Sequence, residues 1–309
     1  MLTKEEITEW FKSLQDTICT ALETEDAKGA SKTSVKFKED NWVREEGGGG
    51  RTRVFQNGNI IEKGGVNFSA VHGDVPDFLN NENASSGSNK DTFYATGVSI
   101  VIHPHNPMVP IIHMNVRYFE MSNGVWWFGG GIDLTPHYVD EEDAKFFHTA
   151  LKTACDKHAS NYYLDFKKWA DDYFFITHRK ETRGVGGIFF DRLGSSPSPQ
   201  GEGRGEVFEF VKEVGNAFAP IYTALMAKNK NKLFTEANKQ WQLLRRGRYV
   251  EFNLVYDKGT KFGLETNGRI ESILMSLPTT AGWEYNFIPA ANSPEEKTLS
   301  LLKKGIDWV

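Results

Sequence analysis

The sequence predicts an α+β protein in which helices cover an antiparallel sheet. The first observation is a series of segments with strand patterning at residues 94–104, 109–120 and 124–134, joined by short turns. The second is helical periodicity in the segments before and after this series. Because strands that follow one another closely usually pair with their neighbours, we expect antiparallel pairing with helices packed on the sheet.

The composition is that of a large globular domain. The 309 residues are 39% hydrophobic, which is enough to bury a sizeable core. Two polar loops at residues 80–91 and 194–205 separate segments of similar composition, so we treat residues 1–309 as a single domain. Lys and Arg number 36 against 41 Asp and Glu, and the net charge of -5 offers no basic excess for binding nucleic acid.

The first residues predict an amphipathic helix that docks on the body of the protein. Thr3 and Glu6 form a capping-box pattern, and apolar residues recur at helical spacing as far as Leu22. The segment is acidic, whereas a mitochondrial transit peptide is rich in arginine and a secretory signal is apolar. We therefore expect a cytoplasmic protein. Because no apolar run reaches about 18 residues, we expect no transmembrane segment.

The rest of the chain alternates strands and helices. An Asn-Gly pair at residues 57 and 58 predicts the turn of a β-hairpin. The glycines at 47–50 predict a tight entry into a strand, because the Lys-Ser/Thr of a phosphate-binding loop does not follow them. Helical periodicity covers residues 140–176, with Asp140 as the N-cap.

The last third is predicted to be two helices followed by two strands. The helices are expected at 206–229, with a kink at Pro220, and at 234–246. Residues 248–257 and 269–278 return to strand patterning.

The two faces of the strand at residues 109–120 differ sharply. Its alternation places His113, Asn115 and Arg117 on one face and apolar side chains on the other. A polar face of an antiparallel strand often only meets water. The next strand, however, carries two tryptophans and a glycine run that ends near Asp133. Glycines within strands often mark the close approach of a ligand, so this face would suit a flat aromatic molecule.

Arginines in three further segments would suit a ligand with several carboxylates. A guanidinium binds a carboxylate through two parallel hydrogen bonds and stays charged at any working pH. A single arginine is more often a surface ion-pair partner of little energetic value. Only arginines that converge in space would form a binding site. The candidates are Arg179, Arg183, Arg245, Arg246, Arg248 and Arg269.

Four blocks of the sequence resemble the signature blocks of oxygen-dependent coproporphyrinogen III oxidase. They are residues 97–120, 126–136, 167–191 and 246–285, and the resemblance extends from about residue 46 to Tyr285. It implies a homodimer whose subunit is a large flat antiparallel β-sheet flanked by α-helices on both faces.

The resemblance also implies a reaction. Two propionates of coproporphyrinogen III become vinyl groups, and protoporphyrinogen IX, CO2 and hydrogen peroxide are released. O2 is the co-substrate, and no metal or organic cofactor is expected.

The same resemblance assigns roles to individual residues. It implies that His113 is a proton donor, that Asp133 meets the pyrrole NH groups, and that His178 is a dimer contact. Our own hypothesis is that Arg117 holds the reacting carboxylate, since positioning and electrostatics supply most of such catalysis. Arg192 stands where the family usually has a second acid. The implied substrate contacts are Ser99, Asn115, Val116, Arg117, Arg183, Asn267, Gly268 and Arg269.

Two other classes of protein stay open. One is a metal-dependent oxygenase or hydrolase that uses His103, His105 and His113, with His148 or His178. Pairs of histidines separated by one residue do bind metals on strands, but Pro104 favours a turn or core role. The other is a non-catalytic carrier of tetrapyrroles or anions, which would need the arginines and aromatic residues but not His113 or Asp133.

Overall fold

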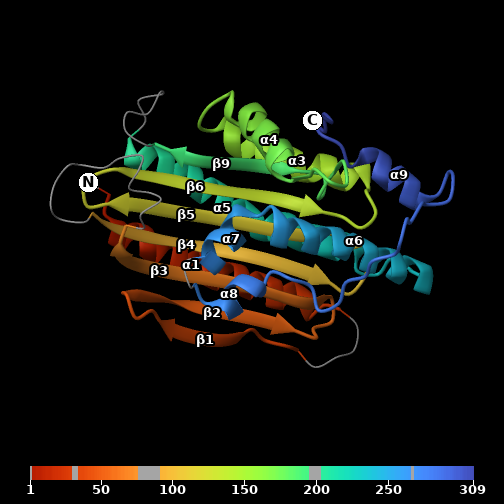
Figure 1. Cartoon of the computed structure of the whole chain (residues 1–309), viewed down its shortest axis with the longest axis horizontal. Coiled ribbons are helices and arrows are strands. Elements are labelled where there is room, and N and C mark those ends of the chain that lie inside the picture. Colours follow the sequence, from red (N-terminus) through yellow and green to blue (C-terminus); the bar gives the residue numbers. More distant parts are fainter. Residues whose placement is uncertain (1, 30–33, 76–90, 195–202, 266–267) are drawn as a thin grey trace.

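A computed structural model describes residues 2–29, 34–75, 91–194, 203–265 and 268–309, and it confirms the α+β class. Seven antiparallel strands form one sheet in the order β1-β2-β3-β4-β5-β6-β9 (Figure 1). A separate ribbon pairs β7 (Phe175–Ile176) with β8 (Glu181–Thr182). The strands of the main sheet are β1 (Lys38–Val43), β2 (Gly48–Gln56), β3 (Ile61–Asp74), β4 (Thr92–Pro104), β5 (Ile111–Met121), β6 (Trp126–Thr135) and β9 (Gly187–Leu193).

Helices cover both faces of the sheet, as expected. In Figure 1, α6, α7 and α8 cross in front of the strands, while α1 and α5 lie behind them. Helix α4 packs against the edge strand β9. The helices are α1 (Lys4–Asp26), α3 (Glu141–Asp156), α4 (Tyr162–Tyr173), α5 (Arg204–Asn229), α6 (Glu236–Val255), α7 (Lys258–Glu265), α8 (Ile270–Leu274) and α9 (Pro294–Leu301). Within the described residues, no helix is both long and apolar enough to cross a membrane.

The main hydrophobic core lies between the sheet and the helices behind it. Met114, Val116 and Tyr118 of β5 are fully buried in this core, while His113, Asn115 and Arg117 between them are only partly buried. The predicted division of β5 into an apolar and a polar face is therefore confirmed. The polar residues of β5 lie on the front face, beneath α6, α7 and α8.

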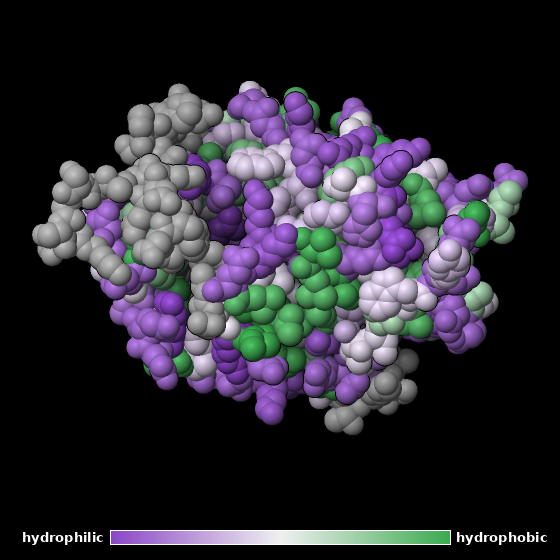
Figure 2. All heavy atoms as spheres, in the orientation of Figure 1, coloured by the Kyte–Doolittle hydropathy of each residue, from purple (hydrophilic) through white to green (hydrophobic). Residues whose placement is uncertain are grey.

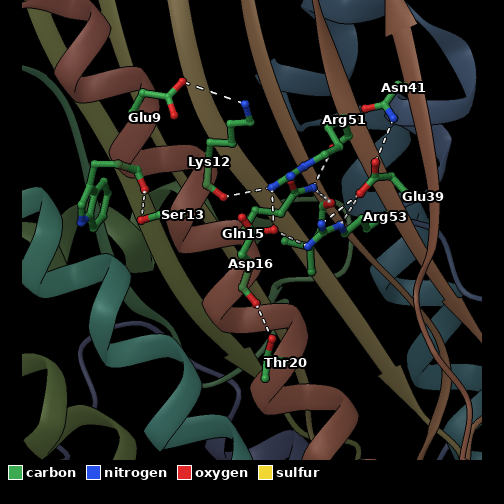
Figure 3. Close-up of polar contacts among 12 residues, drawn as sticks. Glu9, Lys12, Ser13, Gln15, Asp16, Thr20, Glu39, Asn41, Arg51 and Arg53 are labelled. Atoms are coloured by element: carbon green, nitrogen blue, oxygen red, sulfur yellow. Dashed lines mark hydrogen bonds and ion pairs between the residues drawn. The ribbon is translucent and has the colours of Figure 1, made fainter.

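The N-terminal helix fastens the back of the sheet. Its capping box at Thr3 and Glu6 is confirmed. Figure 3 shows how its polar side chains reach the sheet: the Gln15 amide donates to the backbone oxygen of Arg51 at 2.6 Å, and the Arg51 guanidinium binds Asp16 at 2.8 Å. Gln15 is completely buried, so these bonds satisfy a polar group that burial alone would destabilise.

Several local predictions are confirmed. The turn at 57 and 58 lies in the connection between β2 and β3, and Asn57 has a positive φ of 57°. Asp140 caps α3 by accepting hydrogen bonds from the backbone N–H groups of residues 142 and 143. The predicted loops at 80–91 and 194–205 fall largely outside the described residues.

The strands predicted at 248–257 and 269–278 are wrong. Residues 236–255 form one continuous helix, α6, and 270–274 form α8. The first error has a clear cause: Tyr249, Phe252 and Asn253 are buried, and they lie on one face of a helix because they are three and four residues apart. Their aromatic and β-branched neighbours have high strand propensity, but packing of the helix on the sheet overrides it.

Candidate active site

The middle of the front face of the sheet is formed by small and polar side chains. Cross-strand pairing aligns Asn67 of β3, Ser99 of β4 and Asn115 of β5 in one row, which continues to Gly131 of β6. The parallel row contains Gly50, Ser69, Gly97, Arg117 and Gly129. Because glycines have no side chain above the sheet, a flat ligand could approach the backbone here. Figure 2 shows a recess with hydrophilic side chains in this face, beside the region of α7.

Asp133, His113 and Arg183 meet at one end of this face. Asp133 and His113 are directly opposite each other on β6 and β5, and the His113 Nδ1 lies 2.8 Å from the Asp133 carboxylate. The Arg183 guanidinium donates to both carboxylate oxygens at 2.7 Å. Asp133 is only 1% exposed, whereas the His113 side chain keeps 21% of its surface exposed. Of the three, the imidazole is therefore the group that a ligand on the sheet can reach.

The Asp133 carboxylate is ionised despite its burial. Burial alone would raise its pKa, but the charge of Arg183 and the contact with His113 outweigh it and hold the pKa below its ordinary value. An ionised carboxylate only accepts hydrogen bonds, so the His113 Nδ1 must carry the proton. The other ring nitrogen, Nε2, is then the atom that can exchange a proton with a ligand.

Arg183 is enclosed by aromatic rings. Its guanidinium carbon lies 4.4 Å from the ring centre of Phe174 and 4.7 Å from those of Tyr249 and Phe252. The same guanidinium donates to the Asn253 side chain at 2.8 Å. Cation–π contacts and two charge-assisted hydrogen bonds compensate for removing this charge from water. Arg183 is 3% exposed, so it supports Asp133 from below and has little surface for direct contact with a ligand.

Arg117 lies two residues from Asn115 on the same face of β5. Its guanidinium donates to the Asn115 side chain at 2.8 Å and to Asp191 of β9 at 2.7 Å. To reach Asp191 it crosses Gly129 of β6: a Cβ added at Gly129 would lie 2.8 Å from the Arg117 Nη2. Arg117 is still 37% exposed, so it can bind a carboxylate from solution.

The opposite side of the row is closed by α8. Arg269 forms an ion pair with Asp40 of β1, and Ser272 bonds to Thr52 and Asn67. At about 4.8 Å per strand, β1 and β5 are roughly 19 Å apart, so Arg269 and Arg117 flank the row from two sides.

The structure places the predicted substrate contacts in different surroundings, and Arg183 among them is buried against Asp133. Ser99, Asn115 and Arg117 come together on the front face, and Gly268 precedes Arg269 at the α8 side. Val116 turns its side chain into the core behind the sheet, so only its backbone could take part. Asn267 lies outside the described residues. Contact of any of them with substrate stays a prediction.

The other histidines considered as metal ligands, His103, His105, His148 and His178, have separate partners, and the His105 Nε2 lies 3.2 Å from the backbone oxygen of Gly58. His103 is fully buried and bonds to the backbone oxygen of Ser276 at 2.8 Å, and His148 bonds to Tyr163 and to the backbone of residue 185. His178 is exposed on the turn between β7 and β8 and lies 2.6 Å from Glu251. In the described part of the chain, no three His, Cys, Asp or Glu side chains are grouped so as to hold a metal ion.

Sequence reasoning missed Asp191 and Asn253. Asp191 could have been found from the alternation of residues 187–193, which places it on the same face as Phe189. Asn253 was missed because its segment was interpreted as a strand, whereas helical spacing places it beside Tyr249 and Phe252. A cavity of about 540 Å³ lies at the ends of β3, β4 and β5, and its lining includes His72, Phe93 and Glu120.

A sheet face that combines an Asp–His pair, flanking arginines and a glycine floor is typical of an enzyme acting on a flat ligand with several carboxylates. Comparison with known proteins specifies the class further. Residues 6–308 match the family model described as Coproporphyrinogen III oxidase. The chain belongs to this family.

Curated relatives support the family membership. The chain is 51% identical to the oxygen-dependent coproporphyrinogen-III oxidase of Drosophila melanogaster, over 96% of this chain and 76% of the relative. It is 51% identical to the human enzyme of that name, which is designated mitochondrial, over 96% of this chain and 65% of the relative. Identity to the enzyme of Prochlorococcus marinus is 47%, over 96% of this chain and 88% of the relative.

Proposed function

We propose that the protein oxidatively decarboxylates two propionates of coproporphyrinogen III to vinyl groups, with O2 as the oxidant, in haem biosynthesis. Each step converts one propionate, one O2 and one proton into a vinyl group, CO2 and hydrogen peroxide. The supporting observation is the Asp133–His113 pair beside Arg117 on a glycine-floored sheet face, in a chain about 50% identical to enzymes of this name.

The proton that each step consumes comes from His113. Its Nδ1 is fixed by Asp133, so Nε2 faces the ligand and donates when the ring is charged. Asp133 thus acts through His113. Direct contact of Asp133 with pyrrole NH groups would require its bonds to Arg183 or His113 to open, because these bonds occupy both of its oxygens.

Arg117 and Arg269 hold the substrate through its carboxylates. A guanidinium binds a propionate through two hydrogen bonds, and the two arginines stand on opposite sides of the row that contains Ser99 and Asn115. The glycine positions between them let the macrocycle lie close to the sheet.

Anaerobic addition of coproporphyrinogen III to the pure protein, followed by air, tests the proposal. We expect one CO2 and one hydrogen peroxide for each vinyl group formed. We expect His113→Asn to bind substrate but to turn it over at least about 100-fold more slowly. Binding without O2 consumption in the unaltered protein would instead indicate a carrier.

We propose that O2 reacts without a resident metal or organic cofactor. The support is that His103, His148 and His178 bond to separate partners and do not converge on His113. Metal analysis of the pure protein, with activity measured before and after chelation, tests this. Stoichiometric metal whose removal abolishes turnover would favour the metal-dependent alternative.

We propose that the protein is a homodimer that associates through apolar side chains around α7 and α8. Ile270 is 59% exposed and Trp283 57%, and Figure 2 shows apolar side chains gathered over α8. Such patches mark interaction sites. His178, the predicted dimer contact, shares Glu251 with Trp283. Sedimentation should give a dimer that Ile270→Glu converts to a monomer. Leu233→Glu, at an exposed position between α5 and α6, should have no effect. A monomeric parent protein would refute the proposal.

The cytoplasmic localisation expected from the sequence is also a proposal, supported only by the acidic composition of α1. The human relative is named mitochondrial. Fractionation of cells that express the full-length gene product decides between these compartments.

A further inference from the structure

Three aromatic rings stand in a stack on the same sheet face as the candidate active site. Phe119 and Trp127 are directly opposite each other on β5 and β6, and their ring centres lie 4.2 Å apart. Phe93 of β4 continues the stack at 5.6 Å from Phe119, with the two rings almost parallel. We refer to Phe93, Phe119 and Trp127 as the aromatic ladder. All three side chains are partly buried, and the described core clusters include none of them.

The ladder lies next to the arginine that is expected to hold the reacting carboxylate. Phe119 follows Arg117 by two residues on β5, and Trp127 precedes Gly129 by two residues on β6, so each lies about 7 Å from the Arg117 row. Gly129 has no side chain to separate the Arg117 row from the aromatic ladder. A substituent on the macrocycle can therefore move from Arg117 to the ladder without leaving the sheet face.

The chemistry of the reaction provides a ligand group for this position. The first decarboxylation leaves a porphyrinogen with three carboxylates and one vinyl group. The second propionate must then occupy Arg117, so the new vinyl group has to lie elsewhere. A vinyl group is apolar, and stacked rings standing on a sheet present their edges to it in the favoured edge-to-face arrangement.

We propose that the aromatic ladder binds the vinyl group of the three-carboxylate intermediate and so retains this intermediate for the second decarboxylation. This proposal rests on the proposed function, because it concerns the second half of the same reaction. Trp127 and Phe119 are specificity-determining residues for the intermediate. The four-carboxylate substrate, which has no vinyl group, gains little from them.

The test compares two substrates, the four-carboxylate porphyrinogen and the isolated monovinyl three-carboxylate porphyrinogen. For Trp127→Ala we expect KM for the monovinyl substrate to rise about tenfold, the scale of burying two apolar carbon atoms. KM for the four-carboxylate substrate should change less than about twofold. During turnover of that substrate, the variant should release several times more intermediate than the parent protein. Trp127→Phe, which keeps the stack, should restore most of the retention.

Trp126→Ala is the matched control, because this neighbouring tryptophan lies on the opposite face of β6, near Phe128 and Phe208. It should lower stability without changing the ratio of the two KM values. Phe119→Leu provides a second variant if Trp127→Ala does not fold. Equal changes in KM for both substrates, or unchanged release of the intermediate, would overturn the proposal. If the parent protein turns over neither substrate, it is the proposed function that fails.

Discussion

Replacing Asp133 by Asn removes one charge from a buried ion pair and keeps the shape of the side chain. Asp133 and Arg183 are 1% and 3% exposed, so the Arg183 charge would be left uncompensated. Breaking a buried pair in this way costs about 3–5 kcal/mol. This is a large part of the roughly 5–15 kcal/mol that stabilises a typical protein. We therefore expect Asp133→Asn to fold only marginally.

A double variant separates the structural effect from the chemical one. Arg183 lies among three aromatic rings, so methionine should pack well in its place. Asp133→Asn combined with Arg183→Met should recover at least about 2 kcal/mol relative to Asp133→Asn alone, because no buried charge remains. Urea unfolding at pH 7, followed by tryptophan fluorescence, measures each free energy of unfolding. The double variant should be stable and inactive, since His113 has lost its carboxylate.

The contribution of the pair also depends on pH in a defined direction. The pKa of Asp133 is lowered in the folded protein, mainly by Arg183 acting against burial. Its stabilisation is therefore present above the unfolded value of about 3.9 and is lost as the pH falls through the folded pKa. The difference between the parent and Asp133→Asn should shrink below pH 4. A difference under about 1 kcal/mol at pH 7, or additive effects in the double variant, would refute this reasoning.

Three further predictions follow from the same geometry. Gly129→Ala should lower kcat/KM about tenfold, because its Cβ would lie 2.6 Å from Asp191 and 2.8 Å from Arg117. Gly205→Ala, with open space around it, should leave kcat/KM unchanged, and equal activities of the two variants would contradict the prediction. Arg117→Lys should raise KM about tenfold or more in steady-state kinetics, since lysine lacks the planar guanidinium that binds a carboxylate through two hydrogen bonds. An unchanged KM would indicate that Arg117 binds no carboxylate. Burial lowers the pKa of His103 to about 3, so between pH 6.5 and 3 the unfolded chain takes up a proton that the folded protein does not, and the free energy of unfolding falls. His103→Asn should reduce the slope of the free energy of unfolding against pH in this range, and an unchanged slope would disprove the prediction.

The sequence predicts most of the sheet because alternation is a local property. The two faces of β5 follow from residues 111–121 alone, and so does the placement of His113 beside Arg117. The contact between Asp133 and Arg183 joins residues 50 positions apart, and no local pattern encodes it. The helical conformation of residues 248–255 was missed for a related reason, since packing against the sheet overrides the strand propensity of this segment.

The ion pairs of Arg117 and Arg269 affect how a carboxylate ligand bound to these arginines would leave. Arg117 and Arg269 are each held by an acid on an edge strand, Asp191 on β9 and Asp40 on β1. A ligand carboxylate that binds these arginines competes with both aspartates for the guanidinium N–H groups. Once decarboxylation removes a propionate, the displaced aspartate can return to its arginine and compete with the product. Asp191 and Asp40 would thus act as internal competitors of the ligand carboxylates, and each decarboxylation would weaken the binding of its own product.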